Sequence, residues 1–150
     1  MVNQPKPASQ EAFRHQLKRH GLKATRQRLA VHEAMSKLVH ASADDVASEI
    51  AASSDVKITT ASVYNILSTL ADLKIYGRRL GMGNRMFFDA VTTRHFHMYD
   101  RENDVYRDIF DDELADRIQS HLKRRRFKGY TVEDLDIQFI VRPTRKSKNA

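Results

Sequence analysis

Apolar residues recur at helical spacing throughout the first half of the chain. The clearest case is the stretch 60–74, where apolar positions three and four apart are Ala61, Val63, Ile66, Leu67, Leu70, Ala71 and Leu73. This spacing predicts an amphipathic helix with one buried face, and Thr59 or Thr60 can cap its start. The same reasoning predicts helices over residues 10–20, 26–38 and 43–52. Gly21 would end the first, and Thr25 and Ser42 would cap the other two.

Short runs rich in β-branched and aromatic residues replace the helical pattern after residue 74. Residues 75–80 and 85–89 flank the glycine-containing turn 81–84, which predicts a hairpin. Residues 94–99 and 105–109 predict a second strand pair around a polar turn. A helix over 111–125, ended by Gly129, and a last strand over 130–141 would follow. Helices followed by a small hairpin are typical of a winged helix.

The predicted fold is therefore α+β, with two domains. Residues 1–89 would form an N-terminal winged helix-turn-helix DNA-binding domain. Residues 90–150 would form a small α/β domain for dimerisation and metal sensing, with a basic disordered tail from Arg142. The second domain is too small to bury its apolar surface well, so we expect a homodimer.

The charge of the chain favours a polyanionic partner. The net charge is +7 and the sequence pI about 9.8. Residues 1–89 contain 13 Lys and Arg against 8 Asp and Glu, whereas residues 90–150 contain 13 against 11. The excess therefore lies mostly with the predicted winged helix. The chain has neither an apolar run of membrane-spanning length nor a signal-peptide pattern, so we expect a cytoplasmic protein without a membrane partner.

The polar face of the 60–74 helix suits contact with DNA. Thr60, Ser62, Tyr64 and Asn65 cluster near its N-terminal end, where short polar groups and one aromatic ring can meet base edges and thymine methyls. Arg78, Arg79 and Arg85 on the hairpin would reach the backbone or the minor groove. The alternative is an ordinary amphipathic helix with a solvated face, and each arginine alone is more often a surface charge.

Histidines and aspartates provide the candidate metal ligands. The sequence has no cysteine, so any metal must be bound by imidazole nitrogen and carboxylate oxygen. His95 and His97 are two residues apart on a predicted strand, hence on one face. The further candidates are His40, Asp89 and Asp108. Such a set suits Mn²⁺, Fe²⁺ or Zn²⁺.

These ligands would come from both domains, so metal occupancy could control the angle between them. The alternative is that the His-x-His pair lies on the surface, that Asp89 ends a strand and that Asp108 pairs with an arginine. His15, His20, His32 and His121 have no partner at ligand spacing, and we interpret them as surface residues.

Several segments together resemble the ferric uptake regulator family. They are residues 21–28, 40–45 and 60–67, and the pattern Asp89…His95-Phe-His97…Asp108. The resemblance runs from about residue 10 to 141. It implies a homodimeric, metal-responsive transcriptional regulator whose regulatory site comprises His40, Asp89, His95, His97 and Asp108. It also implies DNA contacts at Lys23, near the minor groove, and at Tyr64. Together with the polar and basic residues noted from the sequence, the candidate DNA contacts are Lys23, Thr25, Arg26, Lys57, Thr60, Ser62, Tyr64, Asn65 and Arg78.

The positions at which this chain departs from the family pattern indicate which branch of the family it resembles. Asp100 and Asn103 stand where most members have the first of two Cys-x-x-Cys pairs, and Ala115 and Leu135 stand where a further metal site would be. The cysteine-free pattern resembles the iron response regulator branch, which implies haem as an additional candidate cofactor. That branch has three consecutive histidines where this chain has His95-Phe96-His97.

The leading hypothesis is a repressor of iron or haem genes that binds an AT-rich inverted repeat. Three alternatives stay open at the level of sequence. The same ligands could serve a peroxide sensor through Fe²⁺, or a small metalloenzyme, although no general acid or base is clearly placed. The third is an architectural DNA-binding protein without a sensing function.

Overall fold

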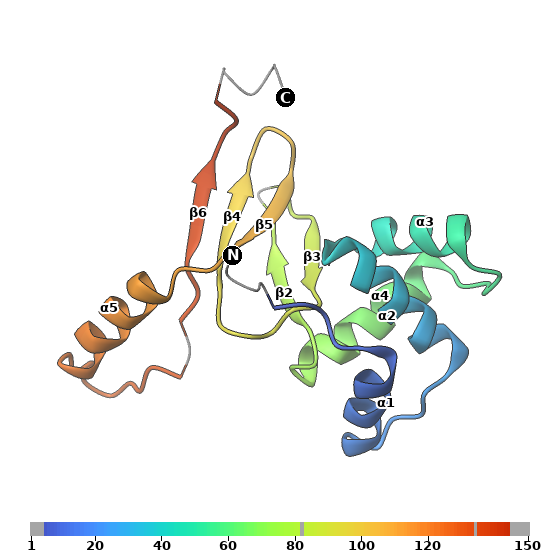
Figure 1. Cartoon of the computed structure of the whole chain (residues 1–150), viewed down its shortest axis with the longest axis horizontal. Helices are drawn as coiled ribbons and strands as arrows, with labels where there is room; N and C mark the ends of the chain where they lie inside the picture. The colour runs from blue at the N-terminus through green and yellow to red at the C-terminus, as the bar shows by residue number, and fades with distance from the viewer. Residues whose placement is uncertain (1–4, 82, 134, 145–150) are drawn as a thin grey trace. The chain divides into compact units, whose positions relative to one another are not determined.

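The structure is a computed structural model that describes residues 5–81, 83–133 and 135–144 (Figure 1). It contains two compact units, residues 1–93 and 94–150. Residues 1–4, Met82 of the hairpin turn, Asp134 of the predicted last strand and residues 145–150 of the basic tail lie outside the described residues. Among the described residues, no helix has the length and hydropathy needed to cross a membrane.

The first unit is a helical core with a small sheet. Its elements are α1 (Gln10–Arg19), α2 (Arg26–Leu38), β1 (His40–Ala41), α3 (Ala43–Ser53), α4 (Thr60–Asp72), β2 (Gly77–Leu80) and β3 (Met86–Asp89). Polar side chains cap α2, α3 and α4 as predicted. The Thr25, Ser42 and Thr59 hydroxyls accept hydrogen bonds from backbone N–H groups of the first turns. This arrangement of helices and hairpin is a winged helix.

Apolar faces of the helices meet in one core. On α4, Val63, Leu67 and Leu70 are completely buried, which stabilises the fold by about 1.5–3 kcal/mol per side chain. Ala61, assigned to this face from the sequence, is exposed instead. It lies in the first turn of α4, beyond the edge of the core.

The sheet of the first unit has three antiparallel strands in the order β1-β3-β2. The hairpin β2–β3 was predicted, but the two-residue strand β1 was not. Gly81 allows the tight turn, because a Cβ there would lie 2.8 Å from the Phe87 ring. At the other end of the turn, Arg85 donates hydrogen bonds of 2.8 Å to Ser42 Oγ and Asp45 Oδ1. Arg85 therefore fixes the hairpin to the start of α3, a role that differs from the expected DNA contact.

The second unit contains β4 (Phe96–Asp100), β5 (Val105–Ile109), α5 (Asp112–Lys123) and β6 (Gln138–Val141). The strand order is β5-β4-β6, with β4–β5 antiparallel and β4–β6 parallel. Strand β5 returns the chain antiparallel to β4, and α5 with the following segment then connects β5 to β6 on the other side of β4. The predicted strand pair over 94–99 and 105–109 is confirmed as β4 and β5, and α5 lies within the predicted range 111–125. The last strand, predicted to begin at residue 130, begins only at Gln138.

Hydrogen bonds to Asp100 close the β4–β5 turn. The Asp100 carboxylate accepts hydrogen bonds from the Asn103 side-chain amide, at 2.7 Å, and from the backbone N–H groups of Glu102 and Asn103. These bonds, the Asn103 amide first, lower the pKa of Asp100. Asp100 and Asn103 thus hold the turn together by hydrogen bonding.

Candidate metal centre and nucleic-acid interface

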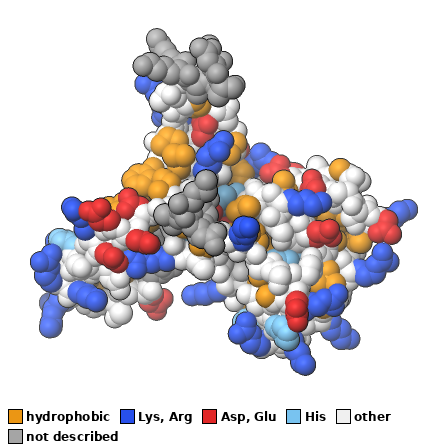
Figure 2. All heavy atoms as spheres, in the orientation of Figure 1, with side chains coloured by type: hydrophobic (Ala, Val, Ile, Leu, Met, Phe, Trp, Pro, Cys, Tyr) orange, Lys and Arg blue, Asp and Glu red, His pale blue; other side chains and the backbone are white. Residues whose placement is uncertain are grey.

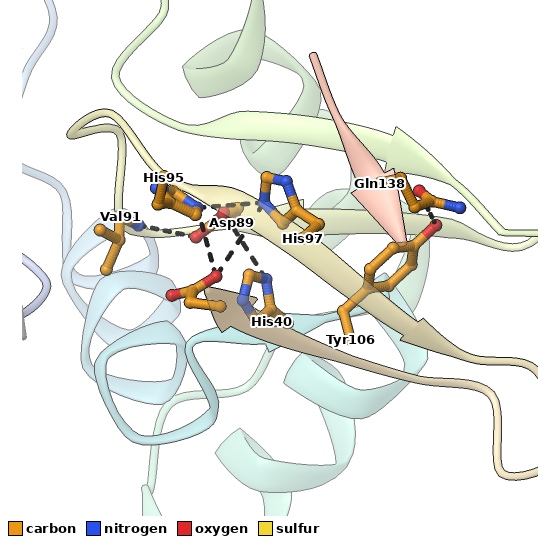
Figure 3. A network of polar contacts seen from close by, with 8 residues as sticks. His40, Asp89, Val91, His95, His97, Tyr106 and Gln138 are labelled. Atoms are coloured by element: carbon orange, nitrogen blue, oxygen red, sulfur yellow. Dashed lines mark hydrogen bonds and ion pairs between the residues drawn. The ribbon is translucent and has the colours of Figure 1, made fainter. Parts of the chain in front are cut away.

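His40 and Asp89 lie side by side in the first unit. They face each other in the β1–β3 register, and His40 Nδ1 lies 3.6 Å from Asp89 Oδ2 (Figure 3). The other carboxylate oxygen of Asp89 accepts a hydrogen bond of 2.9 Å from the backbone N–H of Val91. This bond fixes the carboxylate and leaves Oδ2 directed at the imidazole. The first unit therefore supplies one nitrogen and one oxygen donor at adjacent positions.

The backbone that positions His40 is strained. Val39, the C-cap of α2, has φ 65° and ψ −56°, a region that β-branched residues rarely occupy. Its N–H donates to Met35 O at 2.7 Å, and its carbonyl accepts from Ala90 N at 3.1 Å. Both bonds hold Val39 in this conformation, which turns the chain directly from α2 into β1.

His95, His97 and Asp108 form a second cluster, within the second unit. His97 lies opposite Asp108 in the β4–β5 register. The Nε2 atoms of His95 and His97 are 3.0 Å apart (Figure 3). Asp108 Oδ1 lies 3.2 Å from His95 Nε2 and 4.0 Å from His97 Nε2. His95 precedes β4 instead of lying on the strand, yet its ring still meets that of His97.

The donor chemistry of this cluster fits a divalent transition metal. Two ligands about 2.1 Å from one ion at neighbouring octahedral positions are about 3.0 Å apart, and the two Nε2 atoms have this separation. Both histidines are largely buried, as is Asp108. The sheet also orients the neighbouring groups, because His97 packs edge-on against Tyr106, whose hydroxyl donates to Gln138 Oε1 at 3.2 Å (Figure 3). Residues that the sequence placed on adjacent strands thus converge.

The candidate recognition helix presents its polar residues to solvent. The Tyr64 side chain is 43% exposed, and its ring packs edge-on against Phe88 of β3 at 6.0 Å. Thr60 and Asn65 are exposed, and Ser62 is half-buried because it exchanges hydrogen bonds with Thr59. The hairpin therefore orients Tyr64 without covering it.

The basic candidates differ in their contacts. Arg26 pairs with Asp55 at 3.5 Å, and Arg78 pairs with Asp72. These pairs are exposed, so each contributes only about 0–1 kcal/mol and can be exchanged for a phosphate contact. Lys23 and Lys57 are exposed, and their backbone carbonyls accept hydrogen bonds from Arg28 and Gln27. Both side-chain donors lie on α2 and fix the loops that carry the two lysines, a role that the sequence analysis missed.

The sequence analysis interpreted His32 as a surface residue, and the structure shows that this was wrong. Its side chain is buried and stacks on Phe13 at a centroid distance of 4.0 Å. Nε2 lies 2.6 Å from Ala8 O and Nδ1 2.6 Å from the Tyr76 hydroxyl. Because a carbonyl only accepts, Nε2 carries the proton, and in the neutral ring Nδ1 accepts from Tyr76. Burial lowers the pKa of His32 and raises that of Tyr76.

The first unit is a winged helix, the second is a small α/β unit, and each contains histidine and aspartate side chains that could bind a metal. Residues 19–139 match the model of the ferric uptake regulator family, and the chain belongs to this family. Members are DNA-binding dimers that regulate transcription and are not enzymes. No curated protein sequence matches the chain.

Solved structures with the same fold include regulators named for different signals. The ferric uptake regulator of Vibrio cholerae has a TM-score of 0.72 at 20% identity, covering 87% of this chain and 99% of that one. The manganese-containing ferric uptake regulator of Pseudomonas aeruginosa has a TM-score of 0.70 at 24% identity, covering 87% and 97%. The peroxide stress regulator of Campylobacter jejuni has a TM-score of 0.62 at 24% identity, covering 88% and 96%. These similarities establish the fold.

Proposed function

We propose that this chain is a homodimeric, metal-dependent transcriptional repressor of the iron response branch. It binds an AT-rich inverted repeat and controls iron or haem genes in the cytoplasm. The observation that carries the proposal is the convergence of His95, His97 and Asp108 within a chain whose other unit is a winged helix. An ion of Mn²⁺, Fe²⁺ or Zn²⁺ would hold the three side chains in one fixed arrangement.

The two donor groups are each incomplete on their own. His40 and Asp89 supply two donors, and His95, His97 and Asp108 supply three, whereas Mn²⁺ and Fe²⁺ commonly take five or six ligands. We assign all five residues to one regulatory site. A site shared by the two units would link metal occupancy to their relative orientation, and hence to the spacing of two DNA-binding helices in a dimer.

Dimerisation would occur through the second unit. Its sheet has β5 and β6 at its edges, and Val105, Phe139 and Ile140 on these strands are exposed apolar residues. Exposed apolar strands at sheet edges favour association with another chain. A second copy on this sheet would bury them.

DNA recognition would use the exposed end of α4. Thr60, Ser62, Tyr64 and Asn65 would enter the major groove, with Lys57 near the helix start. Lys23, Thr25, Arg26 and Arg78 would contact the backbone or the minor groove. Of the basic residues, those in exposed ion pairs would exchange a carboxylate for a phosphate.

A DNA-binding titration tests the metal dependence. The full chain is titrated against a fluorescein-labelled AT-rich inverted repeat in chelator, then with Mn²⁺ or Fe²⁺, with a GC-rich duplex of equal length as reference. We expect tight, sequence-preferring binding only with metal. The His95→Ala/His97→Ala variant should lose the metal effect, whereas His15→Ala/His121→Ala, which changes two exposed histidines, should keep it. Equal affinity with and without metal would contradict the switch.

Haem is tested in the same assay. Loss of DNA binding on adding haemin to the metal-loaded protein would support the iron response branch and the assignment of haem as a second cofactor. If haemin leaves the DNA affinity unchanged while metal raises it, the protein is a regulator that responds to metal alone. Peroxide sensing has a separate readout, since Fe²⁺-dependent oxidation would add oxygen to His40 or His95 and raise the protein mass.

A further inference from the structure

A cavity of about 750 Å³ opens beside α5 in the second unit. It is lined by residues of α5, by Arg94, and by residues of the stretch 125–133 together with Leu135. Its size lies within the range of small-molecule sites in proteins, about 300–1,000 Å³. The five candidate metal ligands do not line it, so the cavity is separate from the His/Asp clusters.

The walls of the cavity are apolar and aromatic. Ala115 and Leu122 on α5 face Phe127, Tyr130 and Leu135 from the following segment. The Tyr130 side chain is 83% exposed and that of Phe127 40% exposed. Large aromatic surfaces left open to water around a cavity favour a partner with an apolar body.

The lining of the cavity is also strongly basic. Arg94, Lys123, Arg125, Arg126 and Lys128 line it, against one acidic residue, Glu133. Arg94 pairs with Asp116, and Arg125 lies over the Phe127 ring. Among the residues that the structure describes, none forms an ion pair with Lys123, Arg126 or Lys128. Three cations in the lining are thus available to a ligand.

This charge is concentrated in one place. Residues 94–150 contain 13 Lys and Arg against 11 Asp and Glu, and the segment 123–130 holds five of these basic residues and no acidic one. The rest of the unit is therefore net negative, at −3. Figure 2 shows basic side chains gathered at the free end of α5. An isologous contact of this surface with itself would bring the two positive clusters together, which disfavours a second copy as the occupant.

We infer that this cavity binds an amphiphilic organic anion, with its apolar body against Phe127 and Tyr130 and its anionic head at Arg126 and Lys128. The apolar walls exclude a simple inorganic anion as the best ligand, because it would leave them exposed. The basic lining disfavours an amphiphilic cation. A carboxylate on an aliphatic chain has both required features, and it is the simplest probe of this chemistry.

Calorimetric titration of the full chain with three matched probes tests the inference. Laurate, below its micellar concentration, carries both features. Dodecylammonium has the same chain with the opposite charge, and acetate has the head without the chain. We expect laurate to bind at least tenfold more tightly than either of the others. Each comparison isolates one feature of the cavity.

Variants locate the site. Arg126→Gln/Lys128→Gln should weaken laurate binding about fivefold or more, and Tyr130→Ala should weaken it as well. Arg101→Gln/Arg107→Gln removes the same charge from exposed positions outside the cavity and should leave binding unchanged. Unchanged circular dichroism and Tm for each variant would show that the effect is local.

Four results would overturn the inference. Equal binding of laurate and dodecylammonium would mean non-specific apolar adsorption. Equal loss of laurate binding in both charge variants would place the ligand elsewhere. Binding only to laurate-containing vesicles would identify a lipid surface as the partner. Failure of laurate to bind, together with weaker dimerisation of Arg126→Gln/Lys128→Gln in sedimentation, would show that a second copy covers the cavity.

Discussion

His40 lies directly opposite Asp89 across the β1–β3 pair, with 3.6 Å between Nδ1 and Oδ2. Because strand pairing sets this distance, neither side chain must rearrange far to share an ion. Replacing His40 or Asp89 with Ala should weaken Mn²⁺ binding by about 10- to 100-fold or more, since even changes to groups behind the ligands commonly cost that much. Calorimetric titration with Mn²⁺ measures it.

The matched control for these variants is His15→Ala, which removes an exposed imidazole from α1. Its Mn²⁺ affinity should equal that of the wild type. If His40→Ala and His15→Ala bind Mn²⁺ equally well, then His40 is not a ligand and the regulatory site is confined to the second unit.

Backbone strain at Val39 predicts an unusual response to glycine. Val39→Gly should change the free energy of unfolding by less than about 1 kcal/mol, because relief of roughly 1–3 kcal/mol of strain offsets the lost side chain and the added entropy of the unfolded chain. Val56→Gly, at a half-buried position without positive φ, should be clearly more destabilising. Urea denaturation compares the two variants. If both variants lost the same free energy of unfolding, the backbone at Val39 would not be strained.

The buried His32 predicts a pH-dependent stability. Because its pKa is lower in the folded chain than in the unfolded one, the unfolded state binds more protons. The contribution of His32 is therefore complete above about pH 6.5 and is lost as the pH falls through the folded value. The loss should approach at most about 1.4 kcal/mol per pH unit.

Urea denaturation between pH 7.5 and 5 measures this slope. His32→Phe keeps a ring stacked on Phe13 but loses the hydrogen bonds to Tyr76 and Ala8, so its free energy of unfolding at pH 7.5 should be lower than that of the wild type. Because phenylalanine does not titrate, the change of this free energy with pH should also be smaller. His15→Gln, at an exposed site, should keep the wild-type slope. A wild-type slope in His32→Phe would assign the pH dependence to other histidines.

Tyr64 should be the most sensitive side chain for DNA binding. Tyr64→Ala should reduce affinity for the AT-rich repeat by about 10- to 100-fold, the range expected for one good base contact. Tyr64→Phe keeps the packing against Phe88 and should lose less. Thr69→Ala, exposed at the other end of α4, is the control. Fluorescence anisotropy gives the affinities, and an effect of Thr69→Ala as large as that of Tyr64→Ala would contradict the assignment.

The β4–β5 turn should depend on Asn103. Asn103→Ala removes the main cause of the lowered pKa of Asp100, so that pKa should rise, as followed by NMR of the carboxyl carbon. The turn should also become less stable at neutral pH. Since the carboxylate is the stabilising form, this contribution in the wild type is complete above about pH 3.8 and is lost as the pH falls through the lower pKa of the folded chain. Lys123→Ala, outside the turn, should leave the pKa unchanged.

Local sequence determined most of the helices and two strand pairs, β2–β3 and β4–β5, of this protein. Apolar spacing and capping residues act within a few positions of each other, so α1 to α4 could be located to within two residues at each end. The chemistry of the candidate ligands was also evident, because a cysteine-free chain restricts metal binding to histidine and carboxylate groups. The α+β class and the winged helix followed from the order of these elements.

Only the tertiary structure decided the features that depend on distant partners. Strand β1 has only two residues, too few to show the alternation of apolar and polar positions that marks a strand. It forms because Asp89 and Phe88, almost fifty residues later, pair with it. His32 is buried because Phe13, Tyr76 and Ala8 surround it, although its position on α2 resembles that of exposed histidines. Pairing and burial of this kind arise from contacts between remote segments, which no local pattern of apolar and polar residues specifies.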